Sequence, residues 1–586
     1  MVNLTIDGVQ VLVPEGTTIL KAAELAGKSI PRLCFLEEIN EIGACRMCIV
    51  EVEGNERLVP SCVNTVAEGM VVYTDSPRVL EARQINLQLI LSQHNFACGT
   101  CPRNGTCELQ KMTRDLKDLK PFKSPFPKDI PDNTWDMEAP LIRDNSKCIK
   151  CMRCIQVCDK IQTIGIWDVC GTGSRVSVNV SHNRAFNEVD CTLCGQCIKQ
   201  CPVGALFARD DVSKVVEAID DPEITTIVQV APAVRSSWAE DVKIKPENIS
   251  TERMVGALKA MGFDYVFDAG VTGDLAVMEE SAEFIERFNH RADYKWPMFT
   301  STCPAWVRFL KANFPEMTDG LATSKSPQQM FGALAKSYFA ETANLDPAKI
   351  RVVSIGPCVS AKSEAALETM HDATDDPDVD LVLTTREFAR LIRAKKLRMD
   401  DVEDVTFDQP FATCSGAAAL FGASGGIMDA TMRNIYQTLT GEKPDVNAFR
   451  ALRNVDDGAI REATYTIPEK GDVRVAVVSG LGNTRTLMER IKAGKAEYDF
   501  VEVLACPGGC VNGGGQPINL SREIVETRRQ MLTNLDEASA IRFSAENPDV
   551  QALYKDVLEN SQSEKAQKLL HTDHQAWEMP PHPSVR

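Results

Sequence analysis

Cysteines carry the chemistry that this sequence could perform. Nineteen of the 21 cysteines fall into five groups with ligand-like spacing, and four of these groups lie within the first 201 residues. The fifth group is spread over the C-terminal half and comprises Cys303, Cys358, Cys506 and Cys510. Many clustered thiolates beside one scattered set indicate a redox enzyme in which an electron relay feeds a reaction centre. Disulfides explain the pattern less well, because tight Cys-x2-Cys pairs in a long chain are more typical of metal binding.

The third and fourth groups are the most specific signal. They are the runs Cys148, Cys151, Cys154, Cys158 and Cys191, Cys194, Cys197, Cys201. This repeat matches the bacterial two-cluster ferredoxin pattern, in which the fourth cysteine of each run binds the other cluster. Cys201 is therefore predicted to join the first three cysteines of the first run, and Cys158 those of the second. Zinc fits poorly, because three cysteines at this spacing crowd more thiolates onto one loop than a tetrahedral site uses.

The first group is Cys34, Cys45, Cys48 and Cys62. Two short alternating stretches, at 4–8 and 11–14, and a helical pattern at 19–23 precede it. A β-hairpin, a helix and a cysteine-bearing loop resemble a ferredoxin-type 2Fe–2S domain, although the spacing departs from the plant pattern Cys-x4-Cys-x2-Cys. A structural zinc site is the alternative.

The second group offers only three cysteines, and one ligand is missing. It comprises His94, Cys98, Cys101 and Cys107. His94 stands one helical turn before Cys98, but a lone histidine is usually a surface or core residue. Cys170 and Cys414 belong to no group, and Cys170 is interpreted as a free thiol.

After about residue 216 the pattern changes to apolar strands separated by helical stretches. Buried parallel strands are predicted at 225–230, 265–267, 351–355, 381–383, 473–478 and 500–504. Such a pattern favours an α/β fold with two lobes. A ligand is expected between the strand ends, where open α/β sheets tend to bind.

Three loop motifs, at 300–306, 356–358 and 505–517, accompany the scattered cysteines. Together with 325–329 and 421–426 they resemble the H-cluster domain of FeFe hydrogenases. The resemblance covers nearly the whole chain, because larger members carry the same N-terminal modules in the same order. The first two cysteine groups also resemble modules of respiratory complex I large subunits. Residues 519–586, with His571, resemble the family's small-subunit segment.

This resemblance implies a multidomain α+β and α/β chain with five parts. They are a β-grasp 2Fe–2S ferredoxin-like domain at 1–80, a His-ligated 4Fe–4S module at 81–123, a two-cluster ferredoxin-like domain at 124–215, a two-lobed H-cluster domain at 216–518 and a helical small-subunit-like segment at 519–586. A length of 586 residues agrees with several domains.

The resemblance also implies the cofactors. One 2Fe–2S cluster and three accessory 4Fe–4S clusters, one of them ligated by His94, would lead to the H-cluster. Cys303, Cys358, Cys506 and Cys510 would hold the cubane of the H-cluster, and Cys510 would also bridge to a two-iron unit with CO, cyanide and a dithiolate amine. Further contacts would come from Ala231, Pro232, Ser326, Pro327, Gln328, Pro357, Phe421 and Leu504.

The sequence departs from the family around this site. Members usually have a proton-relaying cysteine directly before the first cubane ligand, where this chain has Thr302. Two relay glutamates match Glu280 and Glu283, but the serine between them is replaced by Ala322. Four further positions differ in residue type. Gly356 and Leu504 replace methionines, Ala361 occupies the position of a cyanide-contacting lysine, with Lys362 one place later, and Ala233 replaces a serine found in some members.

Three functions follow from this comparison. The leading one is reversible formation of H₂ from protons and electrons, and the others are an H₂-sensing or low-activity regulatory hydrogenase and a non-catalytic electron-transfer subunit. Expected partners are H₂ and protons, a ferredoxin or flavin-bearing NAD(P)H-dehydrogenase-type subunit, and maturation proteins. A net charge of −18 argues against nucleic acid. The absence of a long apolar run or an export-like start predicts a cytoplasmic chain without a membrane span.

Overall fold

The computed structural model describes residues 1–116, 135–453, 460–580 and 582. The expected boundary at 123/124 and residues 583–586 of the last segment lie outside the described residues. Two compact units are present, one made of Met1–Phe186 with Gln200–Phe207 and the other of Asn187–Lys199 with Ala208–Arg586. Among the described residues no helix is long and apolar enough to cross a membrane.

The first unit begins with a five-stranded sheet in the order β2-β1-β5-β3-β4. Its strands are β1 (Val2–Ile6), β2 (Val9–Val13), β3 (Ile49–Val52), β4 (Val59–Pro60) and β5 (Val71–Tyr73). The predicted hairpin is confirmed, because β1 and β2 pair antiparallel around Asp7 and Gly8, both with positive φ. That dipeptide suits the tight turn of a two-residue hairpin. Helix α1 (Ile19–Leu25) also agrees with the sequence and packs on the apolar face of this sheet.

The rest of the first unit is loops with short elements. Helix α2 (Pro77–Ser92) begins at a Ser76 cap that accepts from the Val79 amide, and Pro77 suits its first turn. It is followed by α3 (Glu108–Asp115), α4 (Arg153–Gln156) and the antiparallel pair β7 (Trp167–Cys170) and β8 (Ser177–Val180). The buried Arg153 ties these loops together, because its guanidinium donates to Glu108 at 2.8 Å and to the Cys34 carbonyl at 3.3 Å.

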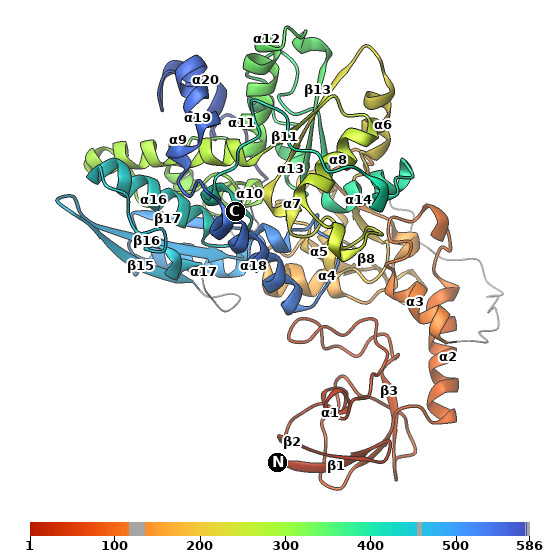
Figure 1. Cartoon of the computed structure of the whole chain (residues 1–586). Helices are drawn as coiled ribbons and strands as arrows, with labels where there is room; N and C mark the ends of the chain where they lie inside the picture. Colours follow the sequence, from red (N-terminus) through yellow and green to blue (C-terminus); the bar gives the residue numbers. More distant parts are fainter. Residues whose placement is uncertain (117–134, 454–459, 581, 583–586) are drawn as a thin grey trace. The chain divides into compact units, whose positions relative to one another are not determined.

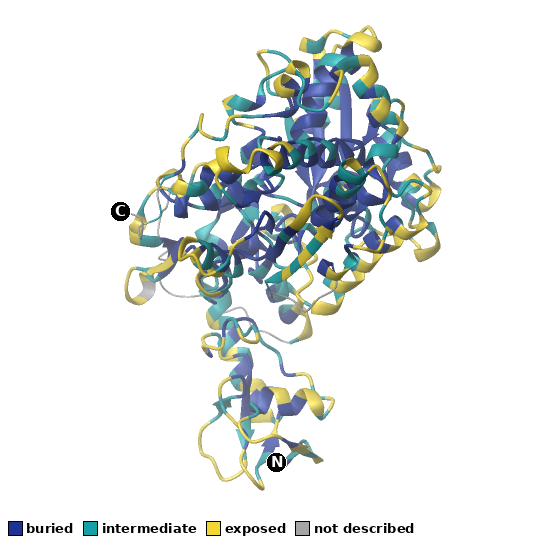
Figure 2. Ribbon diagram, turned by 90° about the vertical axis from the view of Figure 1, so that its left-hand side faces the viewer, coloured by how far each residue is buried: buried dark blue, intermediate teal, exposed yellow. Residues whose placement is uncertain are grey.

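The second unit contains two separate four-stranded sheets (Figure 1). The first has the order β11-β10-β13-β14 and is wholly parallel. Its strands are β10 (Thr225–Val230), β11 (Tyr265–Asp268), β13 (Ile350–Gly356) and β14 (Leu381–Thr384). Two separate apolar clusters contain residues of these strands, so the sheet is buried on both faces (Figure 2). This burial explains why the strands are rich in apolar residues in the sequence.

The second sheet has the order β12-β17-β16-β15. Strands β12 (Met298–Phe299), β17 (Phe500–Leu504) and β16 (Gly471–Ser479) are parallel, and β15 (Arg461–Ile467) pairs antiparallel at the edge. All six predicted strands are therefore confirmed in type. The helices that accompany the two sheets are α8 (Thr251–Met261), α9 (Gly270–Asn289), α10 (Pro304–Asn313), α11 (Pro327–Leu334), α14 (Thr385–Ala394), α16 (Gly426–Thr440) and α17 (Leu481–Lys492).

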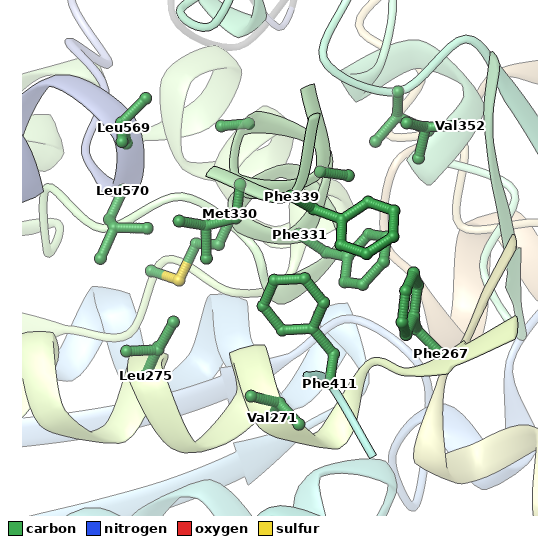
Figure 3. Close-up of a cluster of buried hydrophobic side chains, with 14 of the residues drawn as sticks. Phe267, Val271, Leu275, Met330, Phe331, Phe339, Val352, Phe411, Leu569 and Leu570 are labelled. Atoms are coloured by element: carbon green, nitrogen blue, oxygen red, sulfur yellow. The ribbon is translucent and has the colours of Figure 1, made fainter. Parts of the chain in front are cut away.

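The chain ends with α18 (Arg522–Ala538), α19 (Pro548–Leu553) and α20 (Glu564–Leu570), so the predicted helical segment is present. Leu569 and Leu570 of α20 lie in the same buried cluster as Leu275 of α9 and Met330 of α11 (Figure 3). The segment is thereby anchored to the lobe of the first sheet.

Candidate active site

A cavity of about 140 Å³ lies within the second unit. Its wall contains the loops that follow β10, β12, β13 and β17, which are the carboxyl ends of parallel strands from both sheets. This is where open α/β sheets bind ligands, because loops from neighbouring strands converge there. The cavity lies where the sequence predicts a ligand, and its occupation stays a prediction. We call this space the central cavity.

Three of the four scattered cysteines, Cys303, Cys358 and Cys510, line the central cavity. Burial raises the pKa of the Cys358 thiol well above its ordinary value, and the nearby Cys303 and Cys506 raise it further. Burial acts on Cys510 in the same way, with contributions from the other three thiols. The fold therefore brings together four cysteines that lie up to 207 positions apart.

The donor set fits an iron–sulfur cluster. Four buried thiols resist ionisation by themselves, and coordination to a cationic metal group removes that cost. Within the described part of the chain, no three His, Cys, Asp or Glu side chains are gathered as a site for one metal ion. Three of the cysteines line a cavity and the fourth, Cys506, is close enough to affect the pKa of Cys358 and Cys510, an arrangement that suits a multi-iron group.

The loop after β17 packs very closely against its neighbours. A Cβ at Gly513 would stand 2.5 Å from the Pro357 carbonyl oxygen, and a Cβ at Gly514 would stand 2.4 Å from that of Cys194. The Gln196 amide also donates to the Asn512 carbonyl at 3.0 Å. The glycine run at 513–515 is therefore required for close approach. It places the cysteine run that begins at 191 directly beside the loop of Cys506 and Cys510.

All eight side chains expected to contact the cofactor are found in the wall of the central cavity: Ala231, Pro232, Ser326, Pro327, Gln328, Pro357, Phe421 and Leu504. The substituted positions Thr302, Gly356, Ala361 and Ala233 lie there too. The departures from the family pattern thus gather on one surface, where they change the immediate environment of the site.

Lys362 does not reach the central cavity. Its ammonium group is buried and bonds Asp211 at 2.6 Å and Glu387 at 3.2 Å. Because Ala361 occupies the wall instead, no lysine is found among the cavity-lining residues. Lys362 is a structural ion-pair partner here, and its removal would leave the buried Glu387 without this cation, whereas Asp211 would still pair with Arg209 at 2.9 Å.

Glu364 is a cavity-lining residue that no sequence motif indicated. Burial raises the pKa of its carboxyl to about 7, although hydrogen bonds from Ser326 and Gln328, each at 2.7 Å, oppose the shift. Glu364 ends α13 (Ala361–Glu364), two turns after Cys358. The only signal for it in the sequence was this proximity to a candidate ligand.

Thr302 presents a buried hydroxyl that has no hydrogen-bond partner among the described residues. Glu280 lies behind the cavity wall, and its Oε1 accepts from the Ser301 amide and from the Ser324 hydroxyl, both at 3.3 Å. Its Oε2 likewise has no partner among the described residues. Burial raises the pKa of the Glu280 carboxyl to about 8, so this group carries a proton at neutral pH.

Glu283 is held separately from Glu280. It pairs with Arg287 and accepts from the amide and the hydroxyl of Thr323 at 2.9 Å and 3.0 Å. Ala322 is fully buried and provides no hydroxyl between the two glutamates. Cys414 does not line the central cavity, and its thiol faces the Ser415 carbonyl.

Glu280 makes the stability of the protein depend on pH. The folded protein keeps this proton up to about pH 8, whereas the unfolded chain releases it near 4.5. The contribution of Glu280 to the free energy of unfolding is therefore complete below pH 4.5. It decreases by up to about 1.4 kcal/mol per pH unit as the pH rises to 8. Glu280→Gln should remove this dependence. Chemical unfolding at several pH values should show that the free energy of unfolding of Glu280→Gln exceeds that of the wild type by an amount that increases with pH up to about pH 8.

The exposed Glu286 of the same helix supplies the control. Glu286→Gln should give a stability profile parallel to that of the wild type. A Glu280→Gln profile that also stays parallel would show that the buried carboxyl does not hold the proton.

The N-terminal cysteines gather in the first unit. The Cys48 and Cys62 sulfurs are 3.2 Å apart, and the Cys45 amide lies 3.5 Å from the Cys34 sulfur. The pKa of Cys62 responds to Cys48, Cys34 and Cys45, which shows that all four are close together.

Cysteines of the ferredoxin-like repeat also lie close together. The pKa of Cys154 is raised by burial and by nearby Cys148 and Cys201, and that of Cys151 by burial and by nearby Cys201 and Cys154. The four cysteines of the predicted crossed set are thus neighbours. Cys158 belongs to the first unit and Cys191, Cys194 and Cys197 to the second, so that set stays a prediction.

The His94 module is less completely defined. Cys101 raises the pKa of Cys107, so these two thiols are close. His94 is buried just beyond α2 and packs edge-on against Phe96. Ligation by His94 stays a prediction.

Family comparisons agree with this organisation. Residues 224–514 match the C-terminal domain of the iron only hydrogenase large subunit, and 522–577 match the iron hydrogenase small subunit. The N-terminal matches are a 2Fe-2S iron-sulfur cluster binding domain at 1–77, the NADH-ubiquinone oxidoreductase-G iron-sulfur binding region at 83–117 and a 4Fe-4S dicluster domain at 144–205.

Relatives that match over the whole chain indicate the same family. The chain is 40% identical to the NADP-reducing hydrogenase subunit HndD of Solidesulfovibrio fructosivorans, with 98% of each chain covered. It is 35% identical to iron hydrogenase 1 of Clostridium pasteurianum, over 97% of this chain and 99% of that one. The apo FeFe-hydrogenase HydA1 of Chlamydomonas reinhardtii superposes with a TM-score of 0.56 at 33% identity, covering 64% of this chain and 100% of that one. The chain therefore belongs to the iron-only (FeFe) hydrogenase family and is an enzyme with iron–sulfur modules.

Proposed function

We propose that Cys303, Cys358, Cys506 and Cys510 hold the cubane of an H-cluster and that Cys510 bridges it to a two-iron unit. The convergence of Cys303, Cys358 and Cys510 at one cavity, with Cys506 close to them, carries this proposal. When bound, the H-cluster supplies the redox and Lewis-acid chemistry for reversible conversion of two protons and two electrons into H₂. The apolar contacts from Ala231, Pro232, Pro327, Pro357, Phe421 and Leu504 would exclude water, and Ser326 and Gln328 would orient polar groups.

Two carboxyls near the central cavity can hold a proton at neutral pH. Glu280 keeps one because burial raises its pKa to about 8, and Glu364 is close to half protonated because its pKa is about 7. In the proposed mechanism Glu280 carries the proton between the cavity and Glu283, and the Thr302 hydroxyl can only donate or accept a hydrogen bond at the wall. Glu364 keeps Ser326 and Gln328 in place.

The electron path that we propose uses the N-terminal modules. One 2Fe–2S cluster would be held by the group beginning at Cys34, and three 4Fe–4S clusters by the other three groups, one of them with His94 as a ligand. Close packing of Gly195 and Gly514 supports direct transfer from the last ferredoxin-like cluster to the cubane. The finer division into a β-grasp domain, a His module, a dicluster domain, a two-lobed domain and a C-terminal segment is part of the same proposal.

A flavin-bearing NAD(P)H-dehydrogenase-type subunit is the electron partner that we infer. HndD, which matches over the whole length, is named as a subunit of an NADP-reducing hydrogenase. The strand-to-helix turn at Gly480 could suggest a dinucleotide site, but Arg485 occupies the third glycine position and donates to Asn313 at 2.6 Å. Nicotinamide chemistry would therefore take place on the partner. Maturation proteins would supply the two-iron unit.

The partner is tested by purifying the tagged chain from native extract under anaerobic conditions. We expect flavin-containing subunits to copurify, and the complex to reduce NADP⁺ with H₂. The chain alone should reduce viologen dyes but not NADP⁺. Recovery of the chain by itself, together with efficient ferredoxin reduction, would contradict a flavoprotein partner and favour ferredoxin.

A slow regulatory or H₂-sensing hydrogenase is the second candidate. It is favoured because Thr302, Gly356, Ala361 and Leu504 all line the central cavity. Changes in the immediate surroundings of a metal site alter its activity strongly. The non-catalytic electron carrier considered from the sequence is wrong, because the whole-chain relatives are hydrogenases.

A further inference from the structure

A row of hydrogen bonds joins two glutamates of α9 through residues from elsewhere in the chain. Glu279 Oε2 lies 3.0 Å from His571 Nε2, and His571 Nδ1 lies 2.8 Å from the Thr323 hydroxyl. The Thr323 hydroxyl in turn lies 3.0 Å from Glu283 Oε2. His571 comes from the small-subunit-like segment, so this segment reaches a carboxylate that the proposed proton path uses.

Backbone pairing fixes the position of His571. The Thr572 amide donates to the Thr323 carbonyl and the Lys325 amide to the Leu570 carbonyl, each at 2.8 Å. Leu570, directly before His571, is buried in the cluster that contains Leu275 of α9 (Figure 3). Glu279 and Glu283 are one turn apart and share a face of that helix. The imidazole is thus held between Glu279 and Thr323, and the Gln562 side-chain amide also lies 3.5 Å from its Nε2.

The hydrogen bonds of this row need one proton more than a neutral imidazole, the Thr323 hydroxyl and two ionised carboxylates supply. Three hydrogen bonds in series require three protons. The Thr323 hydroxyl supplies one, a neutral imidazole supplies one, and ionised carboxylates supply none. The third proton must therefore lie on the imidazole or on a glutamate.

The contacts around Glu279 indicate that the imidazole holds this extra proton. Glu279 Oε1 accepts from the Tyr554 hydroxyl at 2.5 Å, and Oε2 accepts from the Gln562 amide at 3.0 Å. With these two donors bound to Glu279, an imidazolium that donates from both ring nitrogens would complete the row. The other titratable or charged groups near the row are Arg287, which pairs with Glu283, Glu280 on the same helix, and His574, which faces the Ala322 carbonyl.

We propose that His571, Glu279 and Thr323 form a one-proton store for Glu283. When Glu283 is ionised, the proton resides on the imidazolium, which Glu279 stabilises. In the transfer, His571 Nδ1 gives its proton to the Thr323 oxygen while the Thr323 hydroxyl proton passes to the Glu283 carboxylate. The products are a neutral imidazole and a protonated Glu283, and the reverse transfer restores the store. His571 and Thr323 are positioning and proton-storing residues that do not touch the cofactor.

This inference rests on the proposed role of Glu283 in proton transfer, but its first test does not depend on H₂ chemistry. The chain has 7 histidines, so ¹⁵N-histidine NMR of the holoenzyme can identify His571 as the signal lost in His571→Gln. At pH 7 we expect this signal to have the ¹⁵N chemical shifts of an imidazolium in the wild type. In Glu279→Gln it should have those of a neutral imidazole. A neutral His571 in the wild type, with infrared spectra showing both glutamates ionised, would overturn the proposal.

The second test uses a matched pair at Thr323. Thr323→Val keeps the shape but interrupts the row, and should lower kcat for H₂ oxidation with a viologen by about tenfold, below the range for a direct acid–base group. KM for H₂ should stay unchanged, because the row does not contact substrate. Thr323→Ser restores the hydroxyl and should stay within about twofold of wild type. Equal rates for both variants and wild type would overturn the proposal, whereas inactivity of all three proteins would instead contradict the hydrogenase assignment.

Discussion

Cys510→Ser is expected to abolish H₂ turnover. Substitutions that only surround a metal site cost about 10- to 100-fold, so losing a bridging ligand should cost on the order of a thousandfold or more. Dye-linked H₂ evolution and uptake by the fully matured protein measure this loss. Infrared spectra of the same sample should lack the CO and cyanide bands that the wild type shows.

Cys170→Ser is the matched control, because Cys170 is a half-buried thiol outside all five ligand groups. It should retain wild-type turnover and the same infrared bands. Electron paramagnetic resonance of both variants should keep the signals of the N-terminal clusters. Turnover by Cys510→Ser close to that of the wild type would show that the four thiols do not form the reaction centre.

Thr302→Cys is expected to raise H₂ turnover by about 100-fold, the lower end of what a positioned acid–base group contributes. A thiol titrates near about pH 8.5, whereas an alcohol keeps its proton throughout the working range. The wall position of Thr302 and its unpartnered hydroxyl mean that the new thiol would face the central cavity. Rates of H₂ oxidation and evolution at matched iron content measure the gain.

Thr302→Ser separates the thiol from a simple change of size. It keeps a hydroxyl, so its rate should not rise. A gain restricted to cysteine supports the low-activity interpretation of the wild type. A wild type that already turns over rapidly, with no gain in Thr302→Cys, would eliminate the regulatory alternative and require another proton carrier.

Local patterns in the sequence were sufficient for much of this fold. The strands at 225–230 and 500–504 are rich in apolar residues because both faces of their sheets are buried. The alternating stretches at 4–8 and 11–14 predicted the hairpin, and the structure places its turn at Asp7 and Gly8, both with positive φ. Cysteine runs such as 191–201 were recognisable because several ligands of one cluster come from a single loop.

The wall of the central cavity could be identified from the sequence only through a family resemblance. Periodicity and spacing do not say that Pro232, Phe421 and Leu504 meet, because they follow different elements. Lys362 shows the limit of alignment by position. It lies one residue after position 361, where the family pattern expects a lysine. On a helix a step of one residue turns the side chain by about 100°. The side chain then pairs with Asp211, 151 positions away, instead of entering the cavity.

By itself the sequence determined which residue types were present and where strands, turns and local ligand runs would form, since these depend on neighbours within a few positions. Only the tertiary structure decided which distant groups share a site. His571 lies 248 positions from Thr323 and 292 from Glu279, yet the three are hydrogen-bonded. Burial, which raises the pKa of Glu280 and Glu364, is likewise a property of the packed chain, because water is excluded only when separate elements close over a side chain.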